Sequence, residues 1–112
     1  MCRADGVSMV ATIGRQVYAR AEGEGKVQRP SNFGVQWIRD TCWCMLNEPV
    51  VPVNANVVMT NSAKYAHYGP GLVGRRMRFG SLRMCVEAAR TGRVPPPPKW
   101  IVRGMRRLLA RR

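Results

Sequence analysis

Residues 64–112, KYAHYGPGLVGRRMRFGSLRMCVEAARTGRVPPPPKWIVRGMRRLLARR, carry nearly all of the net positive charge of this 112-residue chain. Thirteen basic residues lie here against one acid, Glu87, whereas residues 1–63 hold six basic residues and five acids. Like charges at this density repel one another unless an anion neutralises them, and a polyphosphate is the obvious anion. Arginine dominates, and its planar fork binds phosphate through two hydrogen bonds, although a GC-rich genome would also raise arginine content. We therefore expect RNA as the partner of this half.

The predicted phosphate contacts are the basic residues of this half. The triplet Arg75, Arg76 and Arg78 precedes a predicted helix, where cations oppose the helix dipole, so phosphate contact would explain them better than a merely solvated turn. The full predicted set is Lys64, Arg75, Arg76, Arg78, Arg83, Arg90, Arg93, Lys99, Arg103, Arg106, Arg107, Arg111 and Arg112.

Short apolar segments, separated by eleven glycines and eight prolines, limit the fold. We expect one domain over residues 1–112, mainly α: a small, irregular, extended chain with three to four short helices, ordered by a larger assembly. Residues 1–63 form its near-neutral helical half, and residues 64–112 form the basic RNA-facing half. No segment reaches the length of apolar sequence that crosses a membrane.

Helical periodicity and capping residues place the expected elements. The helices are expected from Ser8 to near Gly23, from Ser31 or Asn32 to before Pro49, from Ser81 to Thr91, and over the thirteen residues 100–112. Residues 8–20 fit either an organellar targeting helix or an ordinary surface helix. Between the helices we expect an extended segment at 49–53, one short strand or a groove-covering segment at 57–59, a loop at 61–74 and a stiff spacer at Pro95–Pro98.

No group of residues predicts catalysis. Cys42 and Cys44 form a tight pair, but a structural zinc site usually has four ligands and a second pair is missing, so we expect no metal. His67 has no neighbouring carboxylate with which to form an acid–base pair. Without a nucleotide-binding loop or a nucleophile motif either, we expect no enzyme, no cofactor and no small-molecule substrate. Phe33, Trp37 and Trp100 are predicted to anchor neighbouring proteins.

Four short motifs resemble a family of small-subunit ribosomal proteins specific to mitochondria, number thirty-three in the unified scheme. They are Arg29-Pro30-Ser31-Asn32, Tyr68-Gly69-Pro70, Arg78-Phe79-Gly80, and Arg90 to Pro96 followed by Lys99. The alternation of arginine with bulky apolar residues after Trp100 and the cysteine pair depart from that family. The resemblance implies a mitochondrial matrix location, a place in the small ribosomal subunit and no catalytic role.

The sequence thus predicts a structural constituent of a mitochondrial ribosome that binds rRNA and neighbouring ribosomal proteins. The alternative is an accessory subunit of an inner-membrane respiratory complex, whose basic C-terminal helix would lie on anionic lipid. A third hypothesis is a zinc-dependent RNA-processing cofactor.

Overall fold

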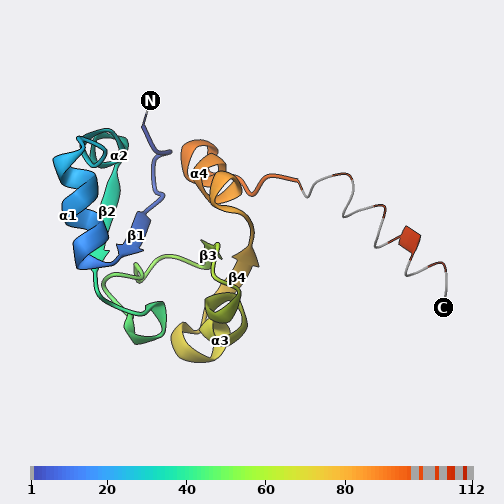
Figure 1. The fold of residues 1–112 in the computed structure, drawn as a ribbon. Coiled ribbons are helices and arrows are strands. Elements are labelled where there is room, and N and C mark those ends of the chain that lie inside the picture. Colours follow the sequence, from blue (N-terminus) through green and yellow to red (C-terminus); the bar gives the residue numbers. More distant parts are fainter. Residues whose placement is uncertain (1, 97–98, 100–102, 104–105, 108–109, 111–112) are drawn as a thin grey trace.

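The computed structural model describes residues 2–96, 99, 103, 106, 107 and 110. Within them the chain forms two units, each built around a pair of parallel strands (Figure 1). The first unit comprises β1 (Met9–Ile13), α1 (Arg15–Gly23), α2 (Gln28–Phe33) and β2 (Val35–Arg39). The second comprises β3 (Val57–Thr60), α3 (Ala63–Val73), β4 (Arg76–Phe79) and α4 (Leu82–Thr91). A short 3₁₀ turn, η1 (Trp43–Met45), lies in the connection between them.

The first unit is a strand–helix–helix–strand unit in which β1 pairs in parallel with β2, from Met9 opposite Val35 to Ile13 opposite Arg39. The predicted helix from Ser8 to Gly23 was wrong over its first part, because the β-branched residues of Met9–Ile13 favour a strand. The predicted second helix was wrong as well. Gly34, in the left-handed region at φ 115°, ends α2, and the chain continues as β2.

The second unit places α3 against β3 and β4, which pair in parallel from Val57 opposite Arg76 to Thr60 opposite Phe79. The loop predicted at 61–74 is instead the helix α3, whose first turn is capped by Ser62. Gly69 lets β4 come close, since a Cβ there would lie 2.1 Å from Cε of Met77. Of the two alternatives left open at 57–59, the structure shows the strand, β3, rather than a segment that covers a groove.

Helix α4 confirms the helix predicted over 81–91. The Ser81 hydroxyl accepts the N–H of Met84 at 3.2 Å, and Gly92, at φ 74°, ends the helix. The predicted spacer and C-terminal helix fall largely on residues outside the described part.

Few side chains are fully buried within the described part: Val51, Thr60, Tyr65, Val73 and Ala89. Tyr65, at 1% exposure, is the largest of them, so the packed centre lies beside α3 in the second unit. Whether the whole chain counts as mainly helical stays a prediction, because the described part combines helices with parallel strands. No helix in that part is both long and apolar enough to span a membrane.

Candidate active-site pocket

Two adjoining hollows lie where the strands end. The first, about 320 Å³, is lined by Thr12, Ile13, Gly14 and Asp40, which follow or end β1 and β2, together with Thr41 and Cys42. The second, about 250 Å³, shares three of these and extends to the residues after β3. It is lined by Thr12, Thr41, Cys42, Trp43, Cys44, Asn61, Ser62, Lys64 and Tyr65. Ligands of open parallel α/β sheets bind outside the carboxyl ends of the strands, so we take these hollows together as the pocket.

Asp40 shapes the first-unit side of the pocket. Its backbone lies in the left-handed region at φ 53°, which aspartate tolerates better than bulkier side chains. Its carboxylate accepts the backbone N–H of Arg15 at 2.7 Å and lies 3.0 Å from Nε of the same residue. A carboxylate at the start of α1 also suits the positive end of the helix dipole. The turn after β2 is therefore fastened to α1, and it directs Thr41 and Cys42 toward the pocket.

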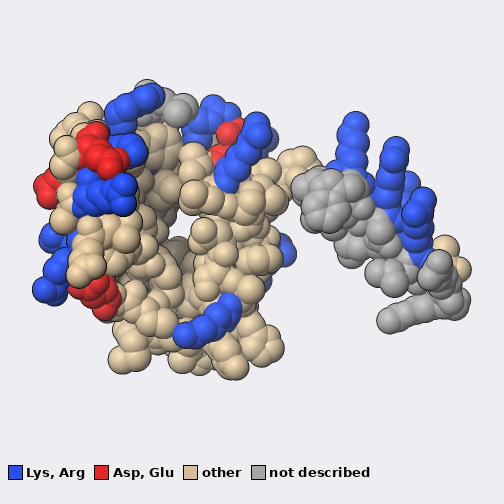
Figure 2. Space-filling view, in the orientation of Figure 1, with Lys and Arg blue, Asp and Glu red and all other residues tan. Residues whose placement is uncertain are grey.

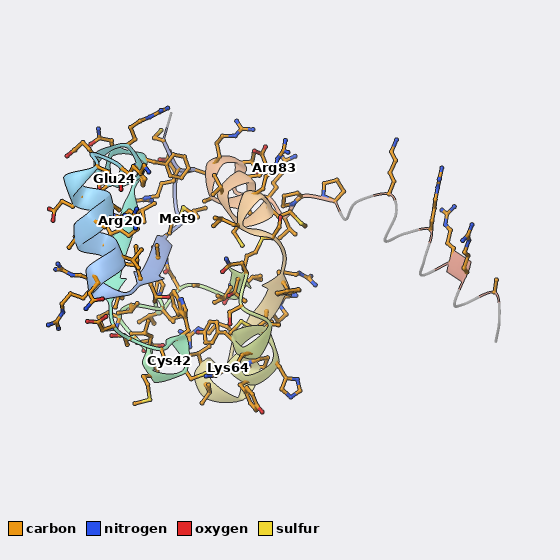
Figure 3. All side chains as sticks on the ribbon, viewed as in Figure 1. Met9, Arg20, Glu24, Cys42, Lys64 and Arg83 are labelled. Carbon is orange, nitrogen blue, oxygen red and sulfur yellow. The ribbon has the colours of Figure 1, made fainter. Side chains whose placement is uncertain are left out.

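Cys42, after β2, and Lys64, in the first turn of α3, line the same hollow, and their side chains meet there (Figure 3). The ammonium of Lys64 donates to Sγ of Cys42 at 3.6 Å. The backbone N–H of Cys44, which hydrogen-bonds to the sulfur, lowers the pKa of Cys42, and the Cys44 side chain and the Lys64 charge lower it further against partial desolvation. A cysteine in such an electropositive, exposed position is held toward its reactive thiolate form.

The first turn of α3 forms the other wall. Ser62 Oγ accepts the N–H of Tyr65 at 3.2 Å, while the Ser62 N–H donates to Oγ1 of Thr60 at 3.0 Å. Among the described residues, the next two amides of the helix, those of Ala63 and Lys64, have no hydrogen-bond acceptor. Free amides and the helix dipole favour an anion at this end, and the ammonium of Lys64 adds a full positive charge.

Tyr65 lines the second hollow and packs against Trp43, which lines it as well. Its ring lies 5.2 Å from that of Trp43, centroid to centroid. Burial raises the pKa of its hydroxyl, as does the nearby Cys44, and that hydroxyl has no hydrogen-bond partner in the described structure. An unsatisfied buried hydroxyl costs about 1–3 kcal/mol.

The described part of the chain holds no group of three or more His, Cys, Asp or Glu side chains placed to bind a metal ion. Cys42 and Cys44 offer two sulfur atoms at the pocket. An ion bound there would need further ligands from outside this chain.

The residues predicted to bind RNA have separate environments. Lys64 lies in the pocket, while Arg75 is mostly buried, at 14% side-chain exposure, and pairs with Glu48 at 2.6 Å. Arg76, Arg78 and Arg83 are exposed on β4 and α4, and Arg90 pairs with Glu87. Arg93 is exposed just after α4, as are Lys99, Arg103, Arg106 and Arg107 further on, and Arg111 and Arg112 lie outside the described residues.

The predicted interface aromatics pack mainly inside this chain. Trp37 donates its indole N–H to Ser31 at 3.0 Å and meets Tyr18 at 5.7 Å between ring centroids, and Phe33 is half-buried at the end of α2. Trp100 lies outside the described residues.

Sequence reasoning did not identify the pocket. Cys42 and Cys44 were considered only as zinc ligands, and residues 61–65 were assigned to a loop. The available signal was the polar sequence Asn61-Ser62 directly after the apolar, β-branched Val57–Thr60, a pattern typical of a strand end followed by a helix cap.

Comparison with known proteins identifies the family of this chain. Residues 2–91 match the family model of the aconitase X third domain. The chain is 55% identical over 96 residues to a cis-3-hydroxy-L-proline dehydratase of Pseudomonas aeruginosa, covering 85% of this chain and 17% of the relative. It is 53% identical over 88 residues to the enzyme of the same name from Hypocrea jecorina, covering 79% of this chain and 15% of the relative. The chain thus spans about a sixth of the length of these relatives.

These matches overturn the ribosomal reading. The predicted rRNA and ribosomal partners, the respiratory-complex alternative and the expectation of no enzyme and no small-molecule substrate were all wrong. The arginine-rich composition led to the wrong prediction of RNA binding, because composition gives the amount of positive charge and not the ligand that this charge binds. The mitochondrial location was inferred from the same resemblance and stays a prediction. From residue 2 to residue 91, this chain belongs to the aconitase X third-domain family.

Proposed function

We propose that the chain is the third domain of an enzyme that removes water from a small hydroxylated amino acid, cis-3-hydroxy-L-proline or a close analogue. The observation that carries this proposal is the 55% identity to the Pseudomonas aeruginosa dehydratase over 85% of the chain. The family match over residues 2–91 includes every residue that lines the pocket. The pocket lies at the strand ends, where ligands of open parallel α/β sheets bind.

Dehydration of a 3-hydroxyproline sets clear chemical demands. A base takes the proton from C2, which the adjacent carboxylate makes the more acidic position. The electrons of that C–H bond form the C2=C3 double bond, the C3–O bond breaks, and the hydroxyl leaves as water after gaining a proton. Negative charge builds on the carboxylate as the C2 proton leaves, so positive groups aimed at the carboxylate accelerate the reaction.

This chain supplies groups that meet part of these demands. The ammonium and the free amide of Lys64, at the start of α3, form a positive end where the substrate carboxylate binds. The ammonium of Lys64 donates to Cys42, and the lowered pKa of this thiol favours the thiolate, the form that can accept a proton. The remaining groups come from the rest of the enzyme, since this chain matches only about a sixth of its relatives.

A chimaera tests the proposal. Residues 2–91 of this chain replace the matching segment of the Pseudomonas aeruginosa dehydratase, and turnover of cis-3-hydroxy-L-proline is followed by NMR. We expect the chimaera to be active. Lys64→Met in the chimaera should lower kcat/KM by about 10²-fold, the effect typical of losing one group that stabilises developing charge.

Lys26→Met is the matched control, because Lys26 is exposed and, among the described residues, its ammonium pairs with Glu24 just beyond the end of α1. It should leave kcat/KM unchanged. A folded chimaera without turnover, or a Lys64→Met variant with the kinetics of the parent, would refute the proposed role of the pocket.

A further inference from the structure

Thr60, the last residue of β3, is a buried polar residue beside the pocket. It is 8% exposed, and the two residues that follow it, Asn61 and Ser62, line the second hollow. Its carbonyl accepts the N–H of Gly80 at 3.1 Å, and its partner in the register of the strand pair is Phe79. A β-branched side chain has few rotamers, so the hydroxyl of Thr60 is fixed in place together with its strand.

The hydroxyl of Thr60 connects the sheet to the first turn of α3. Oγ1 of Thr60 accepts the N–H of Ser62 at 3.0 Å, and Oγ of Ser62 accepts the N–H of Tyr65 at 3.2 Å. Two successive hydrogen bonds therefore run from the end of β3, through the helix cap, into α3. They fix the direction in which α3 leaves the sheet, and with it the place of Lys64 in the first turn.

The place of Lys64 matters because this part of the chain has few charges. Within residues 41–74, Lys64 is the only basic residue and Glu48 the only acidic one. Glu48 is bound to Arg75 at 2.6 Å. On the face shown in Figure 2, the surface over η1 and α3 is accordingly mostly uncharged. If Lys64 were displaced, no other basic residue of this stretch could take its place at the pocket.

Packing alone does not explain a hydroxyl at position 60. The other residues of β3, Val57, Val58 and Met59, are apolar, and valine has nearly the same shape as threonine and favours strands as well. A buried hydroxyl costs free energy unless it is hydrogen-bonded, whereas a buried methyl group does not. The bond to the N–H of Ser62 is thus what the hydroxyl adds, and it acts on the turn that follows the strand.

We propose that Thr60 is a positioning residue of the dehydratase, whose hydroxyl holds the turn at Asn61 and Ser62 so that the ammonium and the backbone amide of Lys64 face the substrate carboxylate. Thr60 acts through Ser62 and Lys64 rather than by contact with the substrate. The inference rests on the proposed function, because the carboxylate is that of the proposed substrate. A misplacement of about 1 Å in a group that stabilises charge is enough to slow a reaction substantially.

Two substitutions in the chimaera separate the hydroxyl from the rest of the side chain. Thr60→Val keeps the shape but removes the acceptor, and it should lower kcat/KM about tenfold because Lys64 is misplaced. Thr60→Ser keeps the hydroxyl and should restore most of the lost kcat/KM. Thr91→Val is the matched control, since Oγ1 of Thr91 also accepts the N–H of the second residue on, Arg93, at 3.2 Å, but at the end of α4. It should leave kcat/KM unchanged.

A double-mutant cycle tests whether Thr60 acts through Lys64. Once Lys64→Met has removed the ammonium, adding Thr60→Val should lower kcat/KM little further, because the group that Thr60 positions is gone. If each substitution instead contributed its full factor to the double variant, Thr60 would act independently of Lys64 and the proposal would be wrong. Unchanged kinetics of Thr60→Val, or an equal loss in Thr91→Val, would also overturn it. So would a Thr60→Val chimaera that does not fold, because Thr60 would then maintain the fold rather than the pocket.

Alkylation of Cys42 by iodoacetamide provides a readout that does not depend on the substrate. The ammonium of Lys64 donates to Sγ of Cys42 at 3.6 Å and favours the reactive thiolate, so Thr60→Val should slow alkylation at neutral pH while Thr91→Val should not. An inactive parent chimaera in which Thr60→Val still slows alkylation would remove the proposed substrate and leave the positioning of Lys64 in place. An active parent in which Thr60→Val changes neither turnover nor alkylation would support the dehydratase function and refute the role of Thr60.

Discussion

Two junctions hold the two units of this chain together, and they differ in construction. At the N-terminal junction, Arg3 donates its backbone N–H to Phe33 at 3.1 Å and Ala4 donates to Ala89 at 2.8 Å. At the pocket junction, side chains meet instead: Trp43 packs on Tyr65 and Lys64 reaches Cys42. Backbone contacts are largely independent of residue type, whereas the pocket junction depends on particular side chains. Substitutions at the pocket should therefore affect stability and chemistry together.

Arg75 extends the pocket junction. Its guanidinium pairs with Glu48 and also donates to the carbonyls of Pro52, Ala55 and Val73. These bonds tie the segment that follows η1 to the end of α3. Arg76, the next residue, is exposed and makes no side-chain hydrogen bond in the described structure. Adjacent arginines in one charged run thus have different roles.

The largest expected effect is that of Tyr65→Ala in the chimaera. Removing this buried ring should lower the local free energy of unfolding by about 3–5 kcal/mol, because a cavity opens beneath Trp43. Pulse proteolysis in urea measures the change. Tyr68→Ala is the matched control: that ring is 57% exposed, and its loss should change stability by less than about 0.5 kcal/mol. Equal losses in both variants would contradict the account of the pocket junction.

Arg75→Met should have the next largest effect. The substitution leaves three carbonyls and Glu48 without their donor, which should cost about 2 kcal/mol in the same assay. Arg76→Met should cost close to nothing, since Arg76 is exposed. If the Arg76 variant were the less stable of the two, the structural role given to Arg75 would be wrong.

Helix caps provide a smaller test. Ser62→Ala and Ser81→Ala each remove a capping hydroxyl, and each should lower stability by about 1 kcal/mol. Only Ser62 lines the pocket, so only Ser62→Ala should also raise the KM for cis-3-hydroxy-L-proline. A raised KM in both variants would show that the kinetic change follows from lost stability.

The smallest expected effect is a difference in the pH dependence of alkylation between two cysteines, Cys42 and Cys85, of the unmutated protein. The pKa of Cys42 is lowered by the Cys44 N–H and Lys64, while burial raises the pKa of Cys85. A lowered pKa keeps the thiolate present to lower pH, so alkylation by iodoacetamide should persist to lower pH at Cys42 than at Cys85. Mass spectrometry across pH 6–10 would show this order, and the reverse order would contradict the lowered pKa of Cys42.

The sequence predicted elements whose signals are local. Helix α4 was found from its cap Ser81, its stop Gly92 and its apolar face, and β3 was one of two alternatives expected at 57–59. The prediction of one helix from Ser8 to Gly23 was wrong over its first part. Val10, Ile13 and Val17 fit helical spacing, but the segment forms a strand followed by a helix. The strand Val35–Arg39 was missed because its apolar residues continue a helical stripe that begins in α2.

The pocket could not be predicted from local signals. Cys42 and Lys64 are separated by 22 positions and meet because the turn after β2 and the start of α3 line the same hollow. Net charge directed attention to the arginines, yet Arg75 binds Glu48 and carbonyls inside the chain, and Lys64 donates to the sulfur of Cys42. Such pairings follow from the arrangement of strands rather than from composition.

Protection of Cys42 by substrate in the chimaera tests the central claim most directly, because it asks whether the pocket is where the substrate binds. Alkylation of Cys42 by iodoacetamide is timed with and without saturating cis-3-hydroxy-L-proline, and Cys2, exposed near the N-terminus, is the internal control. We predict that substrate slows alkylation at Cys42 at least tenfold and leaves Cys2 unchanged. Equal alkylation of Cys42 with and without substrate, in a chimaera that turns the substrate over, would contradict the claim.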